Sequence, residues 1–138
     1  MPACFRYIVN DVDAAIDFYT RHLGFKVEMH PAPGFAEIAH EDMHLYLTRP
    51  SPGVGGGAAM PNGEQQAPGG WNRIHLAVKN LDGLVERLKE AGCTFRSAMI
   101  QGVGGKQILL EDPSGNLVEL FEGNTAAYRA PRSGPGNS

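Results

Sequence analysis

An internal repeat constrains the fold more than any other feature of this sequence. Residues 9–13 (VNDVD) align with residues 78–82 (VKNLD), and a helical stripe of apolar residues follows the match in each half. The repeat predicts two βαβββ modules, an α+β architecture. A sheet with a helix on one face leaves its other face bare, so two such modules side by side would form an open half-barrel sheet with a concave ligand cleft.

Turn and cap residues set the expected boundaries of the elements in both halves. Asn10-Asp11 and Asn80 are N-cap candidates, while Gly24 and Gly92 end the helices. The expected strands and helices, in chain order, are strand 4–9, helix 12–23, strands 25–29, 35–40 and 43–48, then strand 71–78, helix 81–91, strand 93–100 and a final hairpin over 105–122.

Proline and glycine divide the chain into segments. Residues 49–70 contain three clusters of these residues, which disfavour regular structure and are typical of a linker or a binding loop. The prediction is therefore one domain over residues 1–123, with module one at 3–50, a linker at 51–70 and module two at 71–123. Residues 124–138 show no periodicity and are expected to form a loose tail.

The overall composition excludes several classes of protein. A chain of 138 residues with 42% apolar residues and a net charge of −3 suits a globular domain and gives no electrostatic drive toward nucleic acid or acidic membranes. No apolar run approaches the roughly 20 residues of a membrane span, and no basic-then-apolar leader is visible at the N-terminus. The two cysteines, Cys4 and Cys93, do not make a disulfide framework. These features predict a cytoplasmic location.

The final hairpin places a carboxylate between apolar neighbours. Residues 112–115 (DPSG) have turn chemistry, and residues 117–121 (LVELF) resume as a strand. Alternation puts Glu119 on the same face as Leu117 and Phe121. An unpaired buried carboxylate would cost several kcal/mol, so Glu119 requires a cation, a metal or a ligand donor.

Several of these segments together carry a family resemblance. Residues 11–19 (DVDAAIDFY) with 23–25 (LGF), and residues 111–116 (EDPSGN) running into 118–120 (VEL), resemble the vicinal oxygen chelate superfamily. That superfamily includes glyoxalase I, extradiol dioxygenases and the fosfomycin- and bleomycin-resistance proteins. The resemblance covers about residues 3–123 and does not single out one activity. It implies a homodimer, and whether two chains exchange modules across the linker stays open.

The resemblance also implies where a metal would be bound, on the first and last strand of each module. Those four positions hold Cys4, Tyr46, Arg73 and Glu119. Arginine cannot ligate a cation, neutral tyrosine is a poor ligand, and one carboxylate does not hold a metal. A guanidinium opposite Glu119 would satisfy that carboxylate instead. This pattern is similar to that of bleomycin-resistance-like members, and it predicts metal-independent binding of an aromatic or amphipathic, antibiotic-like small molecule, with no cofactor and no catalytic residue.

Two other functions stay open. His75 alternates with Arg73 on one face, and with Glu119 and either His44 or His40 it would make a His/His/Glu set. A metal there would act as a Lewis acid in a lyase or a dioxygenase. Alternatively, the chain is a fold-only binding partner with no small ligand. Separately, Arg73 and Glu119 could form a buried ion pair that fixes the sheet, alone or together with a role in ligand binding.

The predicted site combines polar groups with aromatic walls. Tyr46, Trp71 and Phe121 are candidate stacking surfaces, weighed against a simple role in the core. The glycine runs at 55–57 and 102–105 do not lead from a strand into a helix, so neither is a phosphate loop, and the second is expected to let a loop bend over the cleft mouth. The predicted ligand-binding residues are Cys4, Arg6, Tyr46, Trp71, Arg73, His75, Glu119 and Phe121. The expected partner is a small molecule, without nucleic acid or membrane.

Overall fold

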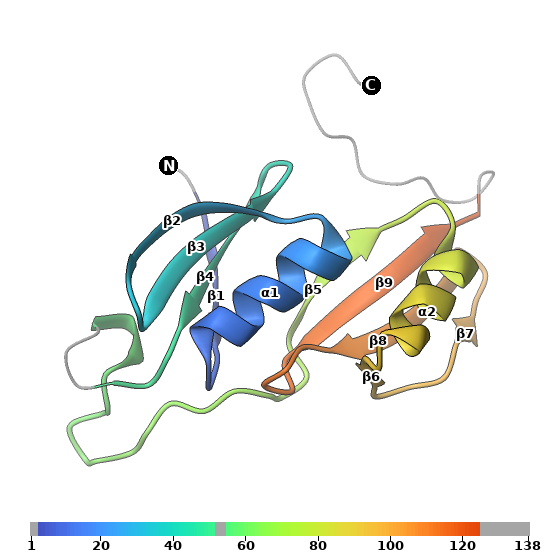
Figure 1. Cartoon of the computed structure of the whole chain (residues 1–138). Helices are drawn as coiled ribbons and strands as arrows, with labels where there is room; N and C mark the ends of the chain where they lie inside the picture. The colour runs from blue at the N-terminus through green and yellow to red at the C-terminus, as the bar shows by residue number, and fades with distance from the viewer. Residues whose placement is uncertain (1–2, 52–54, 125–138) are drawn as a thin grey trace. The chain divides into compact units, whose positions relative to one another are not determined.

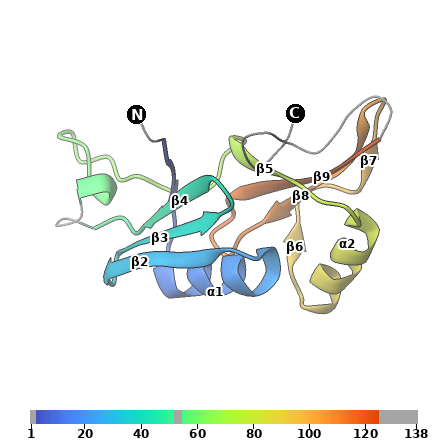
Figure 2. The ribbon, with the colours of Figure 1, turned by 90° about the horizontal axis from the view of Figure 1, so that it is seen from above.

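The computed structural model describes residues 3–51 and 55–124, and the chain divides into two compact units (Figure 1). Unit 1 consists of residues 1–70 together with 113–116, and unit 2 consists of residues 71–112 and 117–138. Each unit has one helix on one side of its own sheet, as both views of the ribbon show (Figure 1 and Figure 2). Neither helix has the length and apolar character needed to cross a membrane, among the residues that the structure describes.

Unit 1 is a four-stranded mixed sheet with the order β1-β4-β3-β2, in which β1 and β4 are parallel and the other pairs antiparallel. The Asp11 side chain caps the helix by accepting from the Ala14 N–H at 3.1 Å, and Gly24 ends it with a φ of 74°. The helix packs on β3 and β4 over side chains such as Ile38 and Leu45. The elements are β1 Phe5–Ile8, α1 Val12–Leu23, β2 Lys26–Ala32, β3 Phe35–His40, β4 Met43–Thr48 and the short 3₁₀ helix η1 Gly55–Gly57.

Unit 2 repeats this plan with the strand order β5-β9-β8-β6, and β7 pairs separately with β8. Strands β5 and β9 are parallel, and the β8–β9 hairpin is antiparallel. The Asn80 side chain caps α2 by accepting from the Gly83 N–H at 3.1 Å. The elements are β5 Arg73–Ala77, α2 Leu81–Glu90, β6 Thr94–Phe95, β7 Ile100–Gln101, β8 Gly105–Glu111 and β9 Leu117–Gly123.

The predicted α+β class is confirmed, and β3 and β4 have the bounds that the sequence predicts. Several other ends differ from the predicted bounds by one or two residues, and two larger differences have identifiable reasons. Strand β2 continues beyond the predicted residue 29 to Ala32, through Pro31, because Pro31 falls in a register irregularity between Met29 and Ala32 on an edge strand, where a proline is tolerated. The predicted strand 93–100 is divided into β6 and β7, and between them the Ser97 hydroxyl accepts a hydrogen bond from the Leu109 N–H at 3.0 Å.

Two segments expected to be irregular contain ordered contacts. The linker includes η1, and the Ser51 N–H donates to the Gly57 carbonyl at 3.1 Å. Asn124, the first residue of the predicted tail, donates from its backbone to Gly104 and from its side chain to Val103. The rest of the predicted tail, residues 125–138, lies outside the described residues.

Asn116 ties the turn of the last hairpin into unit 1. Its amide donates to the Ile8 carbonyl at 2.8 Å, and its side-chain oxygen accepts from the Gly69 N–H at 2.8 Å. Asn116 is only 3% exposed, so the Ile8 carbonyl and the Gly69 N–H have its side chain as their hydrogen-bond partner in place of water.

Replacing Asn116 by Ala is therefore expected to lower the free energy of unfolding by about 2 kcal/mol, because two backbone groups lose their partners. Urea denaturation measures the change. Asn62→Ala is the matched control: Asn62 also accepts from a backbone N–H, that of Glu64, but it is exposed, so a loss within about 0.5 kcal/mol is expected. Equal losses in the two variants would contradict the bridging role of Asn116.

Candidate functional site

The predicted site residues lie on the sheet faces that the helices do not cover. In unit 2, the Glu122 carboxylate accepts from the Leu81 N–H at the start of α2, so the even-numbered residues of β9 face that helix. Glu119 and Phe121 therefore lie on the opposite face. In unit 1, His40 packs on Phe25, which packs on Tyr19 of α1, so the even-numbered residues of β3 face the helix. We call these two uncovered surfaces the helix-free faces of unit 1 and unit 2.

Glu119 is held by two side chains from the neighbouring strand β5. The Arg73 Nε donates to Glu119 Oε1 at 2.9 Å, and the His75 Nε2 lies 3.5 Å from Glu119 Oε2. The Glu119 side chain is 12% exposed, against 31% for Arg73, so the carboxylate is the more buried partner. The guanidinium expected opposite Glu119 is thus present, and the carboxylate has a cation without any metal.

Aromatic rings flank this ion pair in unit 2. The Phe121 ring lies 5.1 Å from the His75 ring, centroid to centroid. Trp71 precedes β5 and is 67% exposed, and the Arg96 guanidinium lies 4.9 Å from its ring. Because Trp71 is mostly exposed, the alternative of a simple core role does not hold for it.

Tyr46 occupies the centre of the helix-free face of unit 1. It is opposite Arg6 on β1 and opposite Glu37 on β3. The Arg6 guanidinium lies 5.3 Å from the Tyr46 ring centroid, and the Phe35 ring packs edge-on against the same ring at 5.2 Å. The Glu37 Oε2 is bound to His44 Nδ1 at 2.6 Å.

The phenol of Tyr46 is kept in its neutral form. Its pKa is raised, chiefly by a hydrogen bond with the sulfur of Cys4 and by the charge of Cys4, and further by desolvation and by the negative charge of Glu37, while Arg6 lowers it. Cys4 itself is exposed. A neutral phenol is a weak ligand for a divalent cation, so Tyr46 serves better as a stacking surface and a hydrogen-bonding group.

The two units repeat the same contact pattern around their central residue. In unit 2, Glu119 is directly opposite His75 and contacts Arg73 diagonally, and in unit 1 Tyr46 is directly opposite Arg6 and is hydrogen-bonded to Cys4 diagonally. Diagonal neighbours in a sheet are within reach of long side chains. His75 and Arg73 are therefore both neighbours of Glu119, and Arg6 and Cys4 are both neighbours of Tyr46.

Sequence reasoning missed three contributors to these faces, Phe35, Glu37 and Arg96. Strict alternation of residues 35, 37 and 39 in β3 was the available signal for the first two. The Arg96 guanidinium also pairs with the Glu111 carboxylate at 3.1 Å, which only the register of β8 reveals.

The donor atoms of this site do not suit a divalent cation. Within the described ranges, 3–51 and 55–124, no three side chains of His, Cys, Asp or Glu lie close enough together to hold one. His40 is on the helix-covered face of unit 1 and is 3.9 Å from Glu41, and His44 is engaged by Glu37. At Glu119 the nearest nitrogen belongs to a guanidinium, which cannot ligate a metal.

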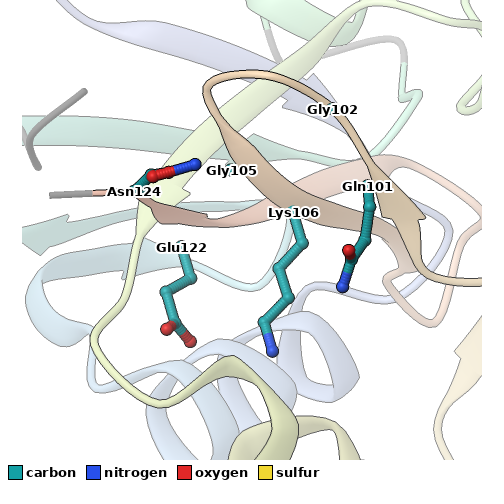
Figure 3. A pocket seen from close by; sticks show the side chains of 7 residues that line it. Gln101, Gly102, Gly105, Lys106, Glu122 and Asn124 are labelled. Carbon is teal, nitrogen blue, oxygen red and sulfur yellow. The ribbon is translucent and has the colours of Figure 1, made fainter. Parts of the chain in front are cut away.

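A separate hollow of about 260 Å³ lies on unit 2, where the β7–β8 turn meets the end of β9 (Figure 3). Gln101, Lys106 and Glu122 extend their side chains to the same side of it. The Lys106 Nζ binds Asp82 at 2.7 Å, which raises the pKa of that lysine, and Glu122 accepts from the Leu81 N–H. The charges of this hollow are thus satisfied by α2, so we do not assign the site there.

Comparison with known proteins places this arrangement in a family. The sequence profile of the Glyoxalase/Bleomycin resistance protein/Dioxygenase superfamily matches residues 3–120. The chain belongs to this superfamily. No curated protein sequence matches it significantly.

Solved structures of the superfamily share the fold at low sequence identity. A glyoxalase/bleomycin resistance protein/dioxygenase from Nocardioides is 21% identical, with a TM-score of 0.70 over 96% of this chain and 89% of that one. A lactoylglutathione lyase from Agrobacterium tumefaciens is 19% identical, with a TM-score of 0.68 over 93% and 98%. The antibiotic-binding protein TnmS3 from a Streptomyces species is 23% identical, with a TM-score of 0.64 over 90% and 98%.

Proposed function

We propose that this superfamily member binds aromatic or amphipathic small molecules on the helix-free face of a unit, without a metal and without changing them chemically. The observation that carries the proposal is the 2.9 Å bond from Arg73 Nε to Glu119 Oε1. At a position where the resemblance implies a metal ligand, the chain has a cation of its own, which would repel a second one. An antibiotic-like compound is the ligand class that follows from the resemblance to bleomycin-resistance proteins.

The side chains on these faces suit recognition of a small molecule. In unit 2, Phe121 offers ring surface for stacking, and Arg73 and Glu119 offer donors and acceptors that fix orientation. On the separate face of unit 1, Tyr46 offers ring surface beside Arg6. Trp71 adds a further exposed ring, already stacked on Arg96 on one side. Apolar walls with a few fixed polar groups are typical of ligand sites.

The similar structures support binding as one of the functions that this fold serves. They include an antibiotic-binding protein and fosfomycin resistance proteins from Mesorhizobium loti and Listeria monocytogenes, but also a lactoylglutathione lyase. Because one fold serves several chemistries, the residues around Glu119 carry the proposal and the fold does not.

Metal analysis of the purified protein tests the metal-independent part of the proposal. After chelation and incubation with Zn²⁺, Ni²⁺ or Mn²⁺, we expect less than stoichiometric metal by mass spectrometry and an unchanged melting temperature. In parallel, a panel of flat aromatic compounds, antibiotics included, should raise the melting temperature, because ligands that bind the folded state stabilise it. Each compound should be recovered intact from the complex. Stoichiometric metal that returns after chelation would reject the proposal.

One observation favours the second candidate, a metal-dependent lyase or dioxygenase. The His75 Nε2 is 3.5 Å from the Glu119 carboxylate, so these two donors already converge. If the wild type takes up metal and His75→Ala does not, the second candidate replaces the first. If neither protein takes up metal, the second candidate is rejected.

The homodimer implied by the resemblance and the cytoplasmic location stay predictions. Light scattering on the purified protein measures the oligomeric state. The expected mass is twice the 14.8 kDa of one chain.

A further inference from the structure

Among the residues that the structure describes, Arg6, on the helix-free face of unit 1, lacks the carboxylate partner that several other cationic side chains of the two faces have. Arg73 pairs with Glu119, Arg96 with Glu111 and His44 with Glu37 at 2.9, 3.1 and 2.6 Å, and His75 is 3.5 Å from Glu119. Within the part of the chain that the structure describes, no carboxylate lies within 4.0 Å of the Arg6 guanidinium. Arg6 is also exposed.

Arg6 is nevertheless held in place. Its guanidinium lies 5.3 Å from the Tyr46 ring centroid, across the parallel β1–β4 pair. Gly56 in η1 lies against the other atoms of the group, since a Cβ at that position would overlap the guanidinium. An ordinary surface arginine moves freely in water, whereas a stacked guanidinium loses less entropy when it binds an anion.

The surroundings of Arg6 select the shape and charge of what it would bind. Tyr46 and Phe35 pack edge to face at 5.2 Å and form an aromatic wall beside the guanidinium. Glu37, which lies on the other side of Tyr46 on this face, is engaged by His44 and does not pair with Arg6. A planar guanidinium binds a carboxylate through two parallel N–H···O bonds, and an aromatic wall suits a flat ring.

We propose that the helix-free face of unit 1 binds an aromatic carboxylic acid, with the carboxylate on Arg6 and the ring against Tyr46 and Phe35. This inference rests on the proposed small-molecule binding and adds the ligand class. Gly56 is a positioning residue in this scheme, because a side chain there would displace the guanidinium without removing its charge.

Binding of 2-naphthoate, measured by calorimetry against its neutral analogue 2-naphthamide, tests the inference. Wild type should bind the acid more tightly than the amide. Arg6→Met should weaken naphthoate binding by about tenfold to a hundredfold and leave the amide unaffected, since a charged hydrogen-bonded pair is lost only with the acid. The naphthoate affinity of Arg6→Lys should lie between those of wild type and Arg6→Met, because an ammonium does not bind a carboxylate bidentately. Gly56→Ala should weaken naphthoate binding while the net charge is unchanged.

Two controls keep the test specific. Arg21→Met removes an arginine of α1 that is paired with Asp17, and it should leave naphthoate binding unchanged. Naphthoate bound against Tyr46 should also protect the exposed Cys4 from iodoacetamide, because the Cys4 sulfur is hydrogen-bonded to Tyr46. Alkylation of Cys93 serves as the internal reference in the mass spectrum.

Three results would overturn the inference: equal binding of the acid and the amide, no binding of either, or naphthoate binding that survives in Arg6→Met. Failure here is distinguishable from failure of the proposed function. If neutral aromatic compounds bind and the carboxylate confers no advantage, only the assignment of Arg6 is wrong. If Arg6 behaves as expected but the protein holds stoichiometric metal, the metal-independent function is wrong and the ligand class stands.

Discussion

Arg73→Met is expected to lower the free energy of unfolding by about 2 kcal/mol. The substitution leaves the Glu119 carboxylate, 12% exposed, between Leu117 and Phe121 without its guanidinium. Breaking a fully buried pair costs about 3–5 kcal/mol and an exposed pair costs about 0–1 kcal/mol, and this pair lies between the two. His75 at 3.5 Å compensates only in part. Urea denaturation at neutral pH measures the loss.

A double variant separates the cost of an unpaired acid from the value of the pair. Arg73→Met with Glu119→Leu should recover most of the lost stability, because an apolar pair of similar volume needs no desolvated charge. The double variant should still bind aromatic ligands with altered preference, since the orienting groups are gone. Arg96→Met is the matched control: its partner Glu111 is 24% exposed, so a smaller loss of about 1 kcal/mol is expected. A loss that the second substitution does not repair would show that Arg73 acts through packing and not through Glu119.

Gly105→Ala is expected to destabilise the protein by about 3 kcal/mol or more. Gly105 has a φ of 149°, a backbone conformation that residues with a side chain rarely adopt. A Cβ there would overlap the Glu122 carbonyl oxygen and lie 3.0 Å from the Gly123 Cα, both on β9. The β8–β9 pairing would have to separate at this end to make room. The melting temperature and urea denaturation measure the effect.

Gly102→Ala, in the turn that precedes β8, is the control. A Cβ at Gly102 would meet only the Gly105 carbonyl oxygen, at an ordinary 3.9 Å. Gly102→Ala should therefore lower the free energy of unfolding by only about 1 kcal/mol, which is typical of point substitutions. If both alanines cost the same, the close approach to β9 would not be the reason that residue 105 is a glycine. The sequence interpretation assigned this glycine run to bending over a cleft mouth, whereas at Gly105 the structure shows a requirement for close strand packing.

The hydrophobic periodicity and the helix caps could be predicted from the sequence, whereas the register between strands could not. The repeat predicted both helices, and alternation placed Glu119 with Leu117 and Phe121, because side-chain direction in a strand depends only on position. The partner of each residue on the next strand depends on turn geometry, which propensity does not supply. The pairing of Glu37 with His44 and the stacking of Arg96 on Trp71 were missed for that reason.

The predicted site residues differ by one diagonal step from those that the strand register pairs directly. The resemblance selected Cys4 and Arg73, while the residues directly opposite Tyr46 and Glu119 are Arg6 and His75. Long side chains bridge that step, so Arg73 contacts Glu119 all the same. The lack of a carboxylate partner at Arg6 could not be predicted, because it depends on Glu37 binding His44 within the same unit.

The Asn116 contacts have a consequence for how the two halves could have arisen and separated. The loop that closes unit 1 is encoded more than 40 residues downstream of it, since Gly69 binds Asn116 across 47 positions. A fragment that ends at residue 70 would lack Asn116. It would therefore lose the side chain that binds Ile8 at the end of β1 and Gly69 at the end of the linker. Whatever single-module ancestor preceded the duplication must have met that need by itself. Residues 1–70 alone therefore lack a side chain on which the fold of unit 1 depends.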